Sequence, residues 1–203
     1  MRSPPRVNVP DACATEDVLT ETTVRPNPEA DLVKLSDLDG LPLTYAEVGA
    51  TNDLGVDDVG RTRGYHHTHV AARIGSGRAR FEEAAEAVMR YGMLRGAGVR
   101  VIASTEVAEV GTLVLGRLGP IWAPCRVVYV LDEPNRRGFA YGTLPGHAEA
   151  GEEFFGVRFD AASGSVYAEV SAFSRPNTWW SKAGAPVTAL VQRVVTQRYL
   201  RAL

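Results

Sequence analysis

Apolar positions recur with two different periods along this chain. Between residues 78 and 94 they fall three or four residues apart, as at Phe81, Ala84 and Val88, and charged residues occupy the positions between them. This spacing predicts an amphipathic helix over 78–94. From residue 99 onward, apolar and polar residues alternate in short runs separated by glycine, proline and aspartate. This second pattern predicts strands joined by tight turns.

The alternating runs define a series of strands. One precedes the helix, and a further six follow it: 65–74, then 99–110, 112–119, 121–133, 136–144, 151–160 and 165–174. Because the connections are too short for crossovers, the strands are expected to form an antiparallel meander. Residues 41–50 are expected to form a short extended segment.

The chain closes on a second helical pattern over 179–202. Beyond Pro186 its apolar residues, among them Val187 and Leu190, form one stripe. The predicted fold is therefore α+β: a strongly curved antiparallel β-sheet or barrel wrapped on a long C-terminal helix, with one further helix. Small residues on the inward positions of such a sheet favour a hollow between sheet and helix.

The N-terminal region differs from the rest. Residues 1–40 contain five prolines and scattered acids, which predicts a flexible or loosely docked extension, or a lid, with at most one short helical turn within 32–38. Residues 41–203 are expected to form the pocket domain.

The composition of the chain limits the classes of partner that it can bind. The 203 residues include 22 Lys and Arg against 24 Asp and Glu, so the net charge of −2 argues against a nucleic-acid binder. Two cysteines exclude a disulfide scaffold and a cysteine-based zinc site. With no long apolar run and no apolar signal segment, we expect no membrane partner and a cytoplasmic location. The sequence leaves the oligomeric state open.

The segment YVLDEPNRRGFAYGTLPGHAEAGEEFFGVRF, with PCRVVYV before it and AFSRP after it, carries a resemblance. Together with LTYAEVGAT and GYHH, it resembles an uncharacterised family of bacteria and plants whose function is unassigned. The resemblance covers about residues 42–203. The order of elements also resembles the helix-grip architecture of START-like and polyketide-cyclase-like proteins. That resemblance implies a small hydrophobic ligand between sheet and C-terminal helix, either carried or converted.

Histidines gather at the start of the first strand. His66 shares a strand face with Thr68 and Val70, so it is expected to point inward, either as a satisfied core group or as a proton carrier. His67 and His69 share the opposite face and have a spacing that can bind zinc. Without an obvious third ligand, we expect no metal site.

Glu153 alternates with Phe155 and Val157, which places a carboxylate at the start of an apolar face. Burial there would raise its pKa towards neutrality, as general acid catalysis requires. The alternative is a strand-end glutamate paired with an arginine. His147, in the turn LPGH, is expected either to cap that turn or to lie at the pocket mouth.

Tyrosines supply further candidates. Tyr141 and Tyr129 are expected on inward faces, Tyr129 on the face of Cys125, where each hydroxyl would be either a core group or a ligand contact. Tyr45 and Glu47 alternate together and are expected to join the same cluster. Trp180 is expected to line a pocket entrance or to anchor the C-terminal helix.

These observations predict a small-molecule pocket protein without a cofactor. The leading hypothesis is a cyclase- or dehydratase-type enzyme acting on a hydrophobic, oxygenated, polyketide-like substrate, for example in spiroacetal formation. His66, Glu153, Tyr141 and Tyr45 would supply the acid and base, and Tyr129, Glu47, His147 and Trp180 would contact the ligand. The alternative is a non-catalytic carrier or sensor of a hydrophobic ligand.

Overall fold

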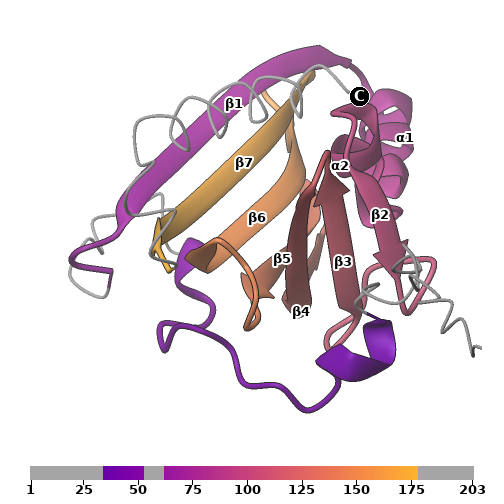
Figure 1. The fold of residues 1–203 in the computed structure, drawn as a ribbon. Coiled ribbons are helices and arrows are strands. Elements are labelled where there is room, and N and C mark those ends of the chain that lie inside the picture. The colour runs from indigo at the N-terminus through magenta and orange to yellow at the C-terminus, as the bar shows by residue number, and fades with distance from the viewer. Residues whose placement is uncertain (1–33, 53–61, 178–203) are drawn as a thin grey trace, which may run out of the picture. The chain divides into compact units, whose positions relative to one another are not determined.

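A computed structural model of the chain describes residues 34–52 and 62–177. It contains one seven-stranded antiparallel sheet with the strand order β1-β7-β6-β5-β4-β3-β2 (Figure 1). The elements in chain order are η1 (Leu35–Leu38), η2 (Ala50–Asn52), β1 (His66–Ser76), α1 (Arg78–Met89), α2 (Gly92–Gly96), β2 (Arg100–Ala103), β3 (Leu113–Leu118), β4 (Ile121–Glu133), β5 (Arg136–Thr143), β6 (Glu149–Asp160) and β7 (Ser165–Pro176). The predicted α+β class and antiparallel sheet are confirmed.

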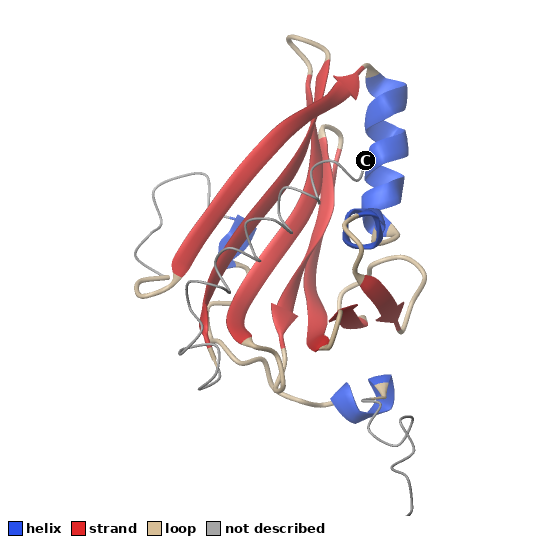
Figure 2. Cartoon of the chain, turned by 45° about the horizontal axis from the view of Figure 1, so that its top comes forward, coloured by secondary structure: helices blue, strands red, loops and turns tan. Residues whose placement is uncertain are grey.

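Strands β2 to β7 form a meander, and β1 pairs with β7 at the far edge. The two helices are inserted between β1 and β2, and α1 packs against β5 and β6 (Figure 2). We call the face that carries α1 the inner face. Its core unites Phe81 and Val88 of α1 with Phe155 and Val170 of the sheet.

The predicted helix over 78–94 is two helices. Tyr91 adopts a left-handed backbone conformation with φ 62°, which ends the first helix after Met89 and turns the chain. The following Gly92 passes close to the backbone carbonyl of Ala87, where a Cβ atom would clash. The apolar periodicity continues across this break because both helices bury residues in the same core.

Residues 34–52 form what we call the strap, and it lies on the opposite, outer face. Leu38 of η1 packs there with Leu113, Leu115 and Leu144, and η2 contacts β6 and β7. The short helical turn expected within 32–38 is confirmed as η1, which covers Leu35–Leu38. The expected extended segment 41–50 is not a strand of the sheet, but it is joined to β5 where the Thr44 amide donates to the Thr143 carbonyl.

The predicted C-terminal helix over 179–202 lies outside the described residues. So does most of the predicted extension over 1–40, of which only residues 34–40 are described. Among the described residues, no helix is long and apolar enough to cross a bilayer.

Candidate functional site

Two consecutive glutamates of β6 face opposite sides of the sheet. Side chains alternate along a strand, so Glu153 lies on the inner face and Glu152 on the outer face. Glu153 is the cross-strand partner of Tyr141, and Glu152 is that of Gly142. These two positions organise the polar groups on each face.

On the inner face, the Tyr141 hydroxyl donates a hydrogen bond of 3.0 Å to Glu153 Oε2. The Tyr141 ring packs edge-to-face on Phe155, with 5.2 Å between the ring centroids. Burial raises the pKa of Glu153 to about 7, the hydrogen bond from Tyr141 opposes this rise, and the nearby Glu149 carboxylate adds to it. Glu153 is therefore divided between its acid and base forms near neutral pH.

Glu153 does not pair with an arginine among the described ion pairs. Its neighbour on the inner face is the buried thiol of Cys125, whose pKa is raised by burial and then by the Glu153 charge. A raised pKa keeps this thiol protonated, and a protonated thiol is a poor nucleophile.

A pocket of about 40 Å³ lies beside Glu153 and Tyr141. Its lining is Tyr141, Thr143, His147, Glu149, Gly151, Glu152, Glu153, Ala172, Phe173 and Ser174. A space of this volume receives one water-sized group rather than a whole ligand. These residues form a small recess. The hollow expected between the sheet and the C-terminal helix stays a prediction, because that helix lies outside the described residues.

His147 lies in this lining, as expected for a group at the pocket mouth. Its Nδ1 lies 3.0 Å from both the backbone nitrogen and the carbonyl oxygen of Glu149, so the Glu149 backbone holds the ring in place. Burial lowers the pKa of His147 to about 4 although its contact with the Glu149 backbone opposes the shift, so the ring is neutral at neutral pH.

His66 is on the predicted face but stands apart from Glu153. The register aligns His66 with Ser174 and Ser174 with Gly151, two residues along the strands from the row of Glu153 and Ala172. Two strand spacings of about 4.8 Å separate β1 from β6. The His66 side chain is exposed, so the prediction of a buried inward group is wrong. The reason is its position at the end of an edge strand.

Tyr45 lies on the outer face, so it does not join the cluster of Glu153 and Tyr141. Its hydroxyl donates to Glu152 Oε2 over 2.7 Å, and its ring packs on Phe173. Burial raises the pKa of Tyr45 strongly, and the Glu152 charge raises it further. The spacing of Tyr45 and Glu47 in the sequence could not show which face of the sheet the strap covers.

Glu152 is the centre of this outer-face cluster and is only 2% exposed. Besides Tyr45, its oxygens accept from the Gly49 N–H at 2.7 Å, the Thr51 N–H at 3.0 Å and the Thr51 hydroxyl. Glu152 drew no prediction from the sequence, because its strand face continues with Phe154 and Gly156 and then with the charged Arg158 and Asp160, whereas that of Glu153 is apolar throughout.

Tyr129 is also on the outer face, and its expected place beside Cys125 is wrong. The pairing with β5 shifts register between Val127 and Tyr129, and such a bulge reverses the side-chain alternation that follows. The Tyr129 hydroxyl lies 2.9 Å from Thr51 Oγ1, and its ring stacks on Phe154.

Glu47 is half-buried on the strap, outside the lining of the recess. It accepts a hydrogen bond of 2.9 Å from Tyr65. Its partial burial acts to raise its pKa, but the hydrogen bonds from Tyr65 and from backbone amides prevail and lower it. Trp180 lies outside the described residues.

The His67 and His69 pair is held by hydroxyl groups: His67 Nε2 lies 3.0 Å from Thr62 Oγ1, and His69 Nδ1 lies 2.9 Å from Ser171 Oγ. Within ranges 34–52 and 62–177, no group of three or more His, Cys, Asp or Glu side chains is placed to hold a metal ion.

Comparison with known proteins gives the fold a context. A hypothetical protein of Helicobacter pylori, jhp0584, is 10% identical with a TM-score of 0.54, covering 71% of this chain and 88% of that one. Norcoclaurine synthase from Thalictrum flavum, a helix-grip protein, is 11% identical with a TM-score of 0.41, covering 64% and 84%. The likeness to the Helicobacter pylori protein shows the fold alone.

Two relatives are similar in sequence. A UPF0548 protein of Deinococcus radiodurans is 35% identical over 179 residues, which is 79% of this chain and 85% of that protein. The Arabidopsis thaliana UPF0548 protein At2g17695 is 31% identical over 140 residues, covering 64% and 67%. The profile described as "Domain of unknown function (DUF1990)" matches residues 44–202. The expected membership of a family with bacterial and plant members is confirmed: this chain belongs to the DUF1990 (UPF0548) family.

Proposed function

We propose that the inner face is the active site of a cofactor-free cyclase- or dehydratase-type enzyme for a hydrophobic, oxygenated small molecule. One observation carries the proposal: Glu153, with its pKa raised to about 7, lies in a recess beside the Tyr141 hydroxyl. A carboxyl group divided between two protonation states near neutral pH can both donate and accept a proton. Its location is proposed to be the cytoplasm.

The recess suits one oxygen atom of a substrate rather than the whole molecule. In the proposed reaction, that oxygen belongs to the ketone of a linear dihydroxyketone. Glu153 gives its proton to this oxygen while a substrate hydroxyl adds to the carbonyl carbon, and the carboxylate then takes the hydroxyl proton. The product of this step is a hemiacetal, and Glu153 is restored to its acid form.

A second cycle completes a spiroacetal. Glu153 protonates the hemiacetal hydroxyl, which leaves as water, and the second substrate hydroxyl adds to the resulting oxocarbenium carbon. The carboxylate accepts the proton of that hydroxyl. One dihydroxyketone thus gives one spiroacetal and one water, with no net change in the protein. Tyr141 orients Glu153 throughout, while His66 stays exposed at the rim of the same face.

The test is turnover of synthetic linear dihydroxyketones, followed by NMR and by chiral chromatography of the spiroacetal. Glu153→Gln is expected to lower the rate by about 10²- to 10⁴-fold, the usual contribution of a general acid–base. Glu83→Gln, which removes an exposed carboxylate on α1, should leave the rate unchanged. Wild-type rates in folded Glu153→Gln would exclude this mechanism.

A carrier or sensor is the second candidate, supported by the apolar core that surrounds the recess. It predicts that the same ketones bind and shift inner-face NMR signals, yet are recovered unchanged. Binding without any product would favour the carrier, and neither binding nor product across the series would reject both functions for this substrate class.

A further inference from the structure

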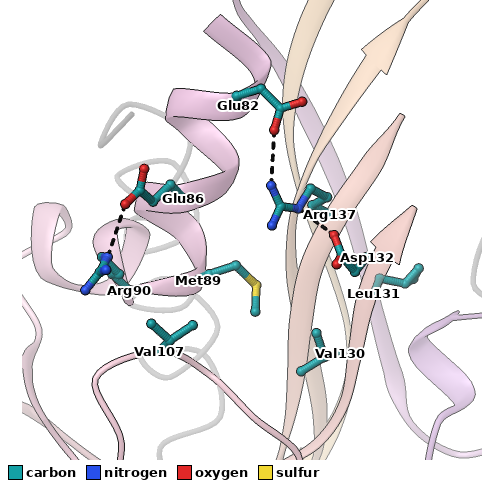
Figure 3. Close-up of a pocket in the computed structure, with 9 residues that line it drawn as sticks. All are labelled: Glu82, Glu86, Met89, Arg90, Val107, Val130, Leu131, Asp132 and Arg137. Atoms are coloured by element: carbon teal, nitrogen blue, oxygen red, sulfur yellow. Dashed lines mark hydrogen bonds and ion pairs between the residues drawn. The ribbon is translucent and has the colours of Figure 1, made fainter. Parts of the chain in front are cut away.

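A second hollow lies away from the recess, between α1 and β4. Its volume is about 420 Å³, within the usual size of ligand sites. It is lined by Glu82, Glu86, Met89, Arg90, Val107, Val130, Leu131, Asp132 and Arg137. Figure 3 shows α1 on one side and strands β4 and β5 on the other, with Met89, Val107 and Val130 between them.

The β4 side of this groove includes main chain as well as side chains. Val130, Leu131 and Asp132 are consecutive, and all three line it. Because side chains alternate across a strand, three consecutive residues can border one groove only if their backbone does so. The groove therefore exposes the edge of β4.

That edge has no neighbouring strand in the described part of the chain. The pairing of β3 with β4 begins at Leu113 and Arg126. The loop before β3 extends the contact only to Val127, which bonds the backbone of Gly111 and Thr112. From Val130 to Asp132 the described strand partners belong to β5 alone. An open strand edge is a template for one more strand.

Charge at the rim favours a basic occupant. Three carboxylates and two guanidinium groups line the groove. Arg137 already pairs with both Glu82 and Asp132, at 3.1 and 2.7 Å. Arg90 pairs with Glu86 at 3.4 Å and with Glu106. Each arginine thus serves two carboxylates, which leaves an excess of negative charge around an apolar floor.

We propose that this groove binds an extended peptide segment of a partner protein, with alternating basic and apolar residues, as an added strand beside β4. Its backbone would bond the edge at Val130–Asp132. Its apolar side chains would contact Met89, Val107 and Val130, while its basic side chains meet the surplus carboxylates. A groove between a helix and a strand edge is a known setting for such strand addition.

The probe is the synthetic peptide acetyl-Lys-Val-Lys-Val-Lys-amide, titrated into the full chain and followed by NMR of backbone amides. We expect the largest shifts at Val130–Asp132 and on the groove side of α1. The peptide acetyl-Glu-Val-Glu-Val-Glu-amide should bind at least about threefold more weakly, because it adds negative charge to an acidic rim.

Backbone pairing is tested by two N-methylated forms of the basic peptide. Alternate residues of a strand direct their N–H groups to the same side. One of the two methylated peptides should bind about tenfold more weakly than the unmethylated peptide, the value of one or two backbone hydrogen bonds. The other should lose less affinity, because its methyl groups point away from β4. Equal effects of the two forms would refute strand addition.

The rim is tested by Glu86→Lys against Glu83→Lys. Both glutamates are exposed on α1 and paired with a nearby arginine, but only Glu86 lines the groove. Only Glu86→Lys should weaken the binding of the basic peptide, by about threefold or more. An absence of shifts at Val130–Asp132 would overturn the proposal. The same shifts with a simple alkylamine would also overturn it and assign a small-molecule site.

Discussion

Glu152 and Glu153 are consecutive in β6, and the two faces of the sheet give them different chemistry. Glu152 is surrounded by four donor groups of the strap, one of which is the Tyr45 hydroxyl. Glu153 has a single described donor, Tyr141, and lies among apolar groups. Donors stabilise the ionised carboxylate, whereas burial without them favours the protonated form.

Burial alone therefore does not make a carboxyl group reactive. Glu152 is as enclosed as the core residues around it, yet its hydrogen bonds hold the strap to the sheet. Glu153 has fewer donors, and its pKa of about 7 suits proton transfer. Partner count, rather than depth, separates the structural glutamate from the candidate catalytic one.

The largest expected effect comes from breaking the Glu152 cluster. Glu152→Gln places an amide N–H₂ among N–H and O–H donors and should lower the free energy of unfolding by about 3 kcal/mol. Urea denaturation at neutral pH measures it. The control Glu47→Gln alters a half-buried carboxylate with one side-chain donor and should cost about 1 kcal/mol or less. Equal losses would mean that the cluster contributes no more than a surface contact.

Replacing Glu153 should increase the free energy of unfolding, in contrast to the replacement of Glu152. Because the pKa of Glu153 is raised from 4.5 to about 7 in the folded state, ionisation destabilises the fold progressively between those pH values. Glu153→Gln removes this cost and should raise the free energy of unfolding at pH 8 by at most about 3 kcal/mol. At pH 4, where the wild-type carboxyl is protonated, the two proteins should differ little.

The pH dependence of that difference is the decisive measurement. His147 contributes in the reverse direction, since its pKa is lowered from 6.5 to about 4 and stability is lost as the pH falls through that range. Unfolding curves of wild type and Glu153→Gln, compared at each pH, cancel the His147 contribution. A constant difference from pH 4 to pH 8 would show that Glu153 titrates normally.

A smaller effect is expected where the strap meets the sheet. A Cβ atom on Gly142 would collide with the Tyr45 ring and hydroxyl, so Gly142→Ala should cost about 2 kcal/mol by overpacking. At Gly116 a Cβ atom would meet Val99 and Ala123 at 3.4 and 3.5 Å, an ordinary contact. Gly116→Ala should change stability by less than about 0.5 kcal/mol. Thermal unfolding of both variants tests whether Tyr45 needs this close approach.

The sequence by itself determined which strands are neighbours, although the predicted strand over 99–110 forms only the short β2, Arg100–Ala103. Alternation placed Glu153 with Phe155 and Val157, and short turns required an antiparallel meander, because both features depend on residues close together in the chain. The same local reasoning identified Glu153, His147 and Tyr141, which the structure brings to one recess. The family resemblance was likewise visible in contiguous segments.

Only the tertiary structure decided which face each tyrosine occupies. A bulge after Val127 moves Tyr129 to the outer face, and the strap carries Tyr45 to Glu152 across 107 positions of sequence. The exposure of His66 follows from its place on an edge strand. Bulges, the path of a strap and the exposure of an edge arise from contacts between distant segments, and a local hydrophobic pattern does not encode them.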